Sequence, residues 1–143
     1  MGATTMWRTV LGILLGVVTT MLVISLVETL GHAIYPPPDG LDPGNPEHVG
    51  HIIALAPTGA LAMVVLAWCV GTFIGAWVGA RIARHPRVAA LVAAGVVMFG
   101  VIAMIKLVPD HPTWMAVLGL LLPLPLALIA AKLAQRREKT LPK

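Results

Sequence analysis

Long apolar stretches alternate with short polar ones along the chain, and this pattern predicts four helices that cross a membrane. About 20 mostly apolar residues are enough to span the hydrocarbon core of a bilayer. Four stretches meet this requirement, at residues 9–34, 58–80, 88–108 and 113–131. Prolines, which do not continue a helix, lie in the connections after the first and third stretches. We therefore expect an all-α fold, a four-helix transmembrane bundle that forms a single domain over residues 1–143.

The connection between the first two spans predicts one further, shorter helix. Asn45 suits the N-cap, Pro46 suits the first helical position and Glu47 suits the positive end of the helix dipole. Apolar residues follow at helical spacing, namely Val49, Ile52, Ile53 and Ala56. We expect a short extracytoplasmic amphipathic helix over residues 46–56. It would lie flat at the membrane surface or, alternatively, cover the ends of the spans.

The basic residues predict which side of the membrane each connection faces. With four crossings, all Lys and Arg residues except Lys106 fall on one side, whereas the connection after the first span is acidic. Basic connections stay in the cytoplasm. We therefore expect both termini to be cytoplasmic.

The composition fits lipid surroundings and excludes nucleic acid as a partner. The chain is 58% hydrophobic and only 11% charged, against about 25% charged in a typical soluble domain. The net charge of +4 comes from residues that flank apolar spans and form no continuous basic surface with aromatic residues. We expect the bilayer itself to be the partner of these basic residues.

Small residues recur every four positions on the first two spans, which predicts close contacts between helices. They are Gly12, Gly16 and Thr20 on the first span, and Ala67, Gly71, Gly75 and Gly79 on the second. These two faces are expected to meet inside the bundle. The alternative is that one of them contacts another copy of the chain or a different protein.

The fourth span contains Pro123 and Pro125, which predict a bend. Each proline lacks a backbone donor, so the carbonyl groups of Gly119 and Leu121 lose their helical partners. In a transporter such carbonyl groups can bind an ion or a substrate, but the prolines can also be purely structural kinks.

A polar cluster is expected near the extracytoplasmic ends of spans one and three. Glu28 and His32 lie four residues apart and share a helix face. Residue counting puts Lys106 at the depth of Glu28, and Asp110 and His111 near the depth of His32. We predict an ion pair between Glu28 and Lys106, with His32 close to Asp110 or His111. The cluster is either structural or a site for a proton, ion, metal or substrate.

No cofactor is predicted, although the histidines could form a metal or haem site. The candidate ligands are His32, His48, His51 and His111. No established metal-binding motif accompanies them. The sequence also lacks a phosphate-binding glycine loop, and Ser25 is its only serine. We therefore do not expect an enzyme.

Three stretches resemble small, four-span membrane proteins of bacteria. They are ETLGHAIYPPPDGLDP, GTFIGAWVGARIA and HPTWMAVLGLLLPLP, at residues 28–43, 71–83 and 111–125. The resemblance implies a location in the bacterial inner membrane and no particular activity.

Three functions are compatible with these features. The first is a structural or accessory membrane protein, as a homo-oligomer or a subunit of a larger complex. The second is a small transporter or channel that moves a proton, ion or small solute with Glu28 and His32. The third is a membrane metal-binding protein or enzyme.

Overall fold

The computed structural model describes residues 2–108 and 111–140, and it confirms the all-helical bundle. Its helices are α1 (Ala3–Ile34), α2 (Pro46–Leu55), α3 (Thr58–Ile82), α4 (Pro86–Leu107), α5 (Thr113–Leu121) and α6 (Pro123–Thr140). Together, α5 and α6 form one membrane span. Four stretches are long and apolar enough to cross a membrane: Thr4–Ile34, Thr58–Ile82, Pro86–Leu107 and Thr113–Arg136. The chain is thus a multi-pass membrane protein.

Helix boundaries follow the local rules read from the sequence, with two differences. First, α1 begins at Ala3, well before the predicted start at residue 9. The polar residues Thr4, Thr5 and Arg8 precede the apolar stretch but do not prevent a helix. Second, the fourth span is divided at Leu122, which keeps helical backbone angles and donates to the carbonyl oxygen of Leu118 at 3.0 Å.

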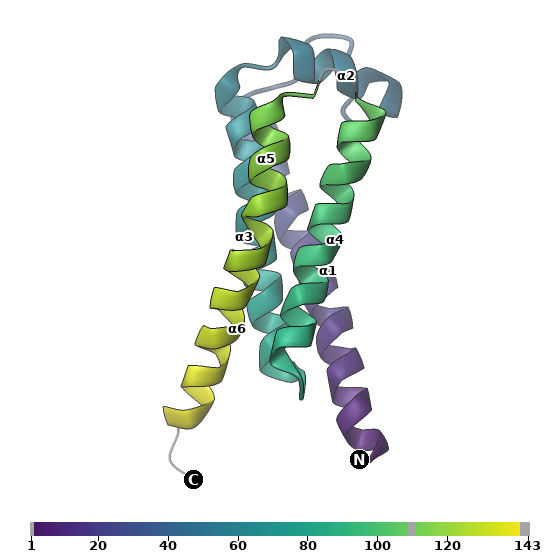
Figure 1. The fold of residues 1–143 in the computed structure, drawn as a ribbon. Helices are drawn as coiled ribbons and strands as arrows, with labels where there is room; N and C mark the ends of the chain where they lie inside the picture. Colours follow the sequence, from purple (N-terminus) through teal and green to yellow (C-terminus); the bar gives the residue numbers. More distant parts are fainter. Residues whose placement is uncertain (1, 109–110, 141–143) are drawn as a thin grey trace.

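The short helix α2 has the predicted N-terminus. The Asn45 side chain accepts a hydrogen bond of 3.1 Å from the backbone of Glu47, and Pro46 is the first helical residue. This helix lies across one end of the bundle (Figure 1). Its residue Ile53 packs against buried residues of the spans, which fits the predicted placement over their ends.

The bundle is organised around α3, which contacts α1, α4, α5 and α6. Its most extensive contact is with α1. Both ends of the chain lie at the bundle end opposite α2 (Figure 1). We call this end the terminal end and the end covered by α2 the loop end. The halves of the bundle next to these ends are the terminal half and the loop half.

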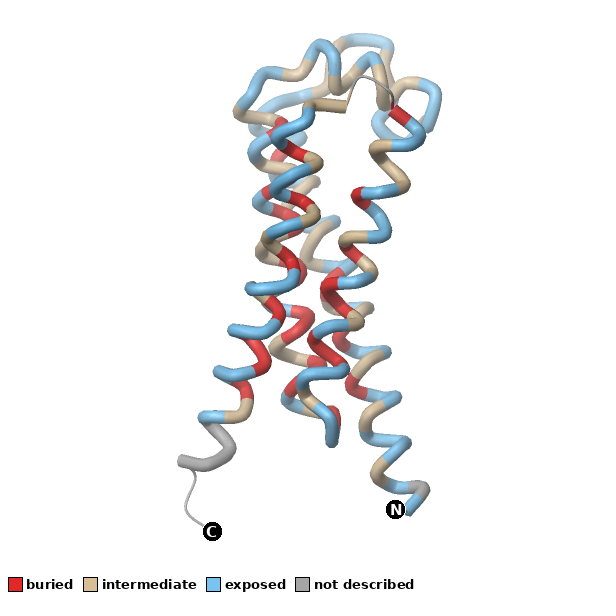
Figure 2. Tube along the Cα trace, viewed as in Figure 1, coloured by how far each residue is buried: buried red, intermediate tan, exposed pale blue. Residues whose placement is uncertain are grey.

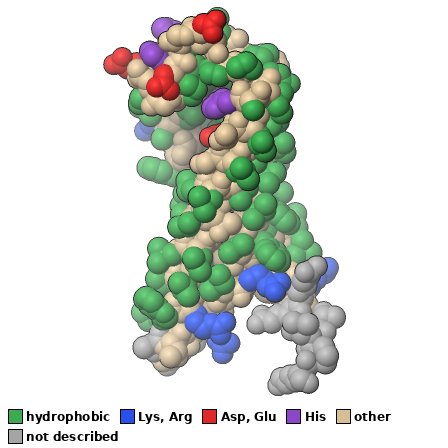
Figure 3. Space-filling model, turned by 180° about the vertical axis from the view of Figure 1, so that it is seen from behind, with side chains coloured by type: hydrophobic (Ala, Val, Ile, Leu, Met, Phe, Trp, Pro, Cys, Tyr) green, Lys and Arg blue, Asp and Glu red, His purple; other side chains and the backbone are tan. Residues whose placement is uncertain are grey.

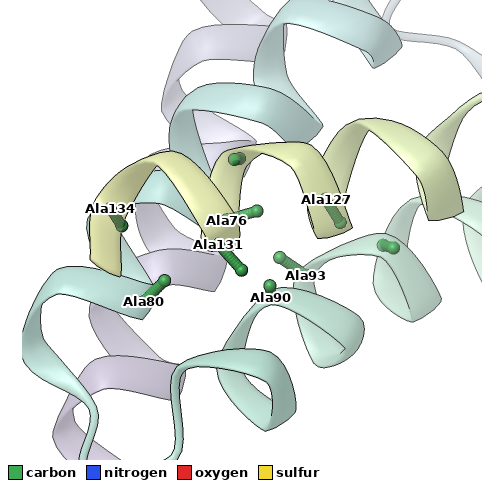
Figure 4. Packing of buried hydrophobic residues seen from close by; sticks show 9 residues of the cluster. Ala76, Ala80, Ala90, Ala93, Ala127, Ala131 and Ala134 are labelled. Atoms are coloured by element: carbon green, nitrogen blue, oxygen red, sulfur yellow. The ribbon is translucent and has the colours of Figure 1, made fainter. Parts of the chain in front are cut away.

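Two clusters of buried residues make up the core. The cluster in the terminal half consists entirely of alanines from α3, α4 and α6 (Figure 4): Ala76, Ala80, Ala90, Ala93, Ala94, Ala127, Ala130, Ala131 and Ala134. The cluster in the loop half contains large side chains: Leu61, Val65, Trp68, Val97, Val101 and Met115. Buried positions face inward along the helices, while exposed positions form the outer surface (Figure 2).

Candidate functional site

A cavity of about 300 Å³ lies under α2 at the loop end. The end of α1, the proline-rich connection, α2 and the start of α3 form most of its wall, and Met104 of α4 and Met115 of α5 complete it. The predicted apolar face of α2 lines this cavity with Val49, Ile52 and Ile53. The cavity is therefore enclosed by the same short helix that the sequence predicts as amphipathic.

The cavity occurs where the small-residue stripes end. Within the stripes, α1 and α3 are in backbone contact. Beyond Thr20, the four-residue spacing on α1 leads to Ile24 and then Glu28. On α3, the residue four positions before Ala67 is Met63, which lines the cavity together with Glu28. Larger side chains thus continue the two stripes in the loop half, where Gly31 of α1 still packs on the Met63 side chain.

Three polar side chains lie on the otherwise apolar wall: Glu28, His32 and Tyr35. Glu28 is partly buried, and His32, one helical turn further, is exposed. Within the described part of the chain, Glu28 forms no hydrogen bond and no ion pair. A carboxyl group in an apolar setting without such partners is costly, so it is the first candidate for contact with a ligand.

The predicted ion pair between Glu28 and Lys106 is wrong. Both residues are described, but Lys106 is exposed and no ion pair joins them. The reason is the rotation of α4 about its axis. Met104 faces the cavity, and Lys106, two residues later, is turned by about 200° around the helix. The depth estimate alone could not reveal this rotation.

The other members of the predicted cluster do not complete a site with Glu28. Asp110 lies outside the described residues. His111 is not part of the cavity wall, and its Nδ1 atom lies 3.2 Å from the carbonyl oxygen of Pro112. The His111 Nε2 atom is buried without a hydrogen-bond partner among the described atoms. Of the described members of the predicted cluster, only Glu28 and His32 therefore lie together at the cavity.

The candidate metal ligands are not gathered either. Among the described residues, no three His, Cys, Asp or Glu side chains are placed to hold a metal ion. His48 instead stabilises the connection, because its Nδ1 atom accepts a hydrogen bond of 2.9 Å from the backbone of Asp42. His51 is exposed on α2.

The glycine stripes of α1 and α3 face each other in the terminal half. A Cβ atom built at Gly16 would lie 3.0 Å from the carbonyl oxygen of Gly75, and one at Gly12 would lie 2.8 Å from that of Gly79. A Cβ atom at Gly75 would collide with the Thr20 hydroxyl group. Such positions admit only glycine, so these stripes are used inside one chain.

The two prolines of the fourth span have different surroundings. Pro123 is buried and Pro125 is exposed. The helix is interrupted between α5 and α6 at Leu122, and α6 leaves the line of α5 in Figure 1. Just before this point, Gly119 receives the Trp68 ring, since a Cβ atom there would lie 2.7 Å from Trp68 Cζ3.

Sequence reasoning missed several residues of the cavity wall. They include Tyr35, Met104 and Met115. In the structure the Tyr35 hydroxyl group packs on Gly59, where a Cβ atom would lie 2.5 Å away. The change from small to large residues along the stripes near Glu28 was the available signal.

Comparison with known proteins adds no assignment to this geometry. No protein-family model, no curated protein and no solved structure matches the chain. The resemblance to small four-span bacterial proteins therefore rests on the three quoted stretches, and the cavity must be interpreted from its own chemistry.

Proposed function

We propose that the chain is a protein of the bacterial inner membrane that binds a small, mainly apolar molecule in the loop-end cavity. The observation that carries this proposal is a largely apolar cavity with two titratable side chains, Glu28 and His32, on its wall. Binding sites for small molecules commonly combine an apolar lining with a few polar groups that orient the ligand.

The polar groups define the chemistry of the ligand. A molecule with an apolar body would contact α2, α3 and the two methionines, and its hydrogen-bonding head would meet Glu28 and His32. Such a head removes the cost of leaving the Glu28 carboxyl group without a partner. Tyr35 also lines the cavity, and its hydroxyl group packs on Gly59 near the start of α3.

The cavity is better suited to binding a molecule from one side of the membrane than to a continuous passage through the bundle. Its wall contains residues from the loop half only. In the terminal half, glycine and alanine contacts bring helix backbones together. The proposal thus keeps one part of the transporter hypothesis, namely that Glu28 and His32 bind a small solute. It places this binding at one membrane surface.

The same proposal places the loop end outside the cytoplasm. Basic side chains gather at the terminal end, and acidic and histidine side chains at the loop end (Figure 3). The positive-inside rule then puts both termini in the cytoplasm. In a Cys69→Ala background, a membrane-impermeant thiol reagent added to spheroplasts should label D39C and spare R84C. Labelling of R84C alone would reverse this orientation.

Ligand binding is tested by filling the cavity. Ala60 lines it, whereas Ala62 on the same helix is exposed and is not part of its wall. Native mass spectrometry of the gently purified protein should detect a bound apolar molecule. We expect at least a tenfold loss of this species in Ala60→Phe and no loss in Ala62→Phe, which adds the same volume on the outside.

A second variant separates occupancy of the cavity from a folding defect. Glu28→Gln preserves the shape of the side chain but removes its charge, and it should reduce occupancy while the thermal stability stays close to that of the wild type. If the wild type carries no such molecule in membranes or mild detergent, or if Ala60→Phe retains it, the cavity is not a binding site.

An accessory role is the second candidate, and the position of α1 supports it. Only 17% of the residues in its most apolar window are buried, against 39% for α3. The exposed face of α1 is therefore available to lipid, to another copy or to a different membrane protein. Cross-linking from L22C and L26C in membranes distinguishes these cases, since lipid contact alone gives no protein adduct.

A further inference from the structure

A second hollow lies at the terminal end, between the start of α4 and α6. It is lined by Arg87, Leu128, Ala131, Lys132, Gln135 and Arg136. Its volume is about 620 Å³. None of these residues lines the loop-end cavity, so a ligand of this second hollow would bind independently of the ligand proposed for the first.

The lining changes from apolar to basic along α6. Leu128, Lys132 and Arg136 follow one another at intervals of four residues, and Ala131 and Gln135 lie beside them at helical spacing. Leu128 and Ala131 lie deeper in the span, while Lys132 and Arg136 lie toward its end. This gradient suits a molecule with apolar chains and an anionic head.

The basic side chains of the hollow come from the ends of two membrane spans. Arg87 is in the first turn of α4, where the span Pro86–Leu107 begins, and Lys132 and Arg136 lie in the later turns of the fourth span. Two spans thus place cations from separate helices at one level. The acidic side chains that the structure describes lie toward the loop end (Figure 3), so they do not neutralise Arg87 and Lys132.

We infer that this hollow binds the headgroup phosphate of an anionic phospholipid, with an acyl chain along the exposed Leu128. Basic pockets between membrane helices on the cytoplasmic side bind anionic headgroups, because each Lys or Arg near the surface attracts the negative charge. Arg87 and Lys132 contact the phosphate from opposite walls. A free phosphate ion would use the same cations but not the apolar part of the hollow.

The test compares two double variants that remove the same charge from the same end of the bundle. Arg87→Gln with Lys132→Gln changes the hollow. Arg8→Gln with Arg84→Gln changes exposed basic residues that do not line it. Native mass spectrometry measures retention of phosphatidylglycerol and of phosphatidylethanolamine by each protein, and thermal unfolding without added lipid verifies that each variant is folded.

We expect the wild type to retain phosphatidylglycerol at least tenfold better than phosphatidylethanolamine. Each charge removed from the hollow should lower this retention by about fivefold, while the control double variant keeps it. Equal losses in both double variants would show general surface attraction and overturn the site. Complete displacement of phosphatidylglycerol by millimolar inorganic phosphate would show a simple anion site and overturn the lipid assignment.

Discussion

The two halves of the bundle pack in opposite ways. In the terminal half, α1 and α3 meet through glycines, and α3, α4 and α6 meet through an alanine cluster. In the loop half, the buried residues include Leu61, Trp68 and Met115, and a cavity remains beneath α2. The same four spans therefore meet through small residues in the terminal half and through large side chains in the loop half.

This difference reflects what holds helices together in lipid. Apolar helices gain little by leaving lipid for one another, so their association depends on close packing. Glycine and alanine give this packing in the terminal half, because backbones approach without intervening side chains. In the loop half, larger side chains make the contacts, and a cavity lies beneath α2.

The largest expected effect comes from placing a large side chain in the closely packed half. Gly75→Leu would drive a side chain into the Thr20 hydroxyl group and the backbone of Gly16. Since backbone atoms on the neighbouring helix cannot move aside, we expect a loss of more than about 3 kcal/mol in unfolding free energy. Denaturant titration in mild detergent measures this loss.

Gly95→Leu is the matched control for that substitution. A Cβ atom at Gly95 meets no atom within 4 Å, so the same change should alter the unfolding free energy by less than about 0.5 kcal/mol. Equal sensitivity at both positions would mean that the contact between α1 and α3 is not the basis of the close packing.

The loop half should respond most to removal of a large side chain. Trp68 is buried and packs on Gly119 and the surrounding cluster. We expect Trp68→Ala to cost about 3 kcal/mol, because the vacated volume loses its packing contacts. Trp114 lies in the same half but is exposed, and Trp114→Ala should cost well under half as much in the same titration.

The smallest expected effect separates space from hydrogen bonding in the glycine contact. The Thr20 hydroxyl group is buried and donates to the carbonyl oxygen of Gly16 at 2.9 Å. Thr20→Val keeps the shape and removes this bond, which should cost about 1 kcal/mol. The exposed Thr29 makes the same kind of bond to Ser25 at 2.7 Å, so Thr29→Val should be nearly neutral.

If Thr20→Val and Thr29→Val prove equally neutral, the contact between α1 and α3 depends on steric fit alone. If Thr20→Val is as damaging as Gly75→Leu, the hydrogen bond is more important than the close approach. Either result would sharpen the contrast between the two halves.

The sequence by itself determined the four spans and the short helix. These features depend on neighbours in the chain: apolar length sets a span, proline limits it, and the Asn45–Glu47 capping pattern starts α2. The four-residue spacing of glycines also identified the faces that can pack closely. Such predictions need only the spacing of residues along one segment, because they do not depend on where the other helices lie.

Only the tertiary structure decided how each helix is rotated and what the loop end encloses. The spans are apolar on all sides, so their sequences do not reveal which side faces lipid except where small residues mark a contact. Depth put Lys106 beside Glu28, but the rotation of α4 turned Met104 toward the cavity instead. The cavity exists because α1, α2, α3, α4 and α5 meet at one end, and no single segment encodes that meeting.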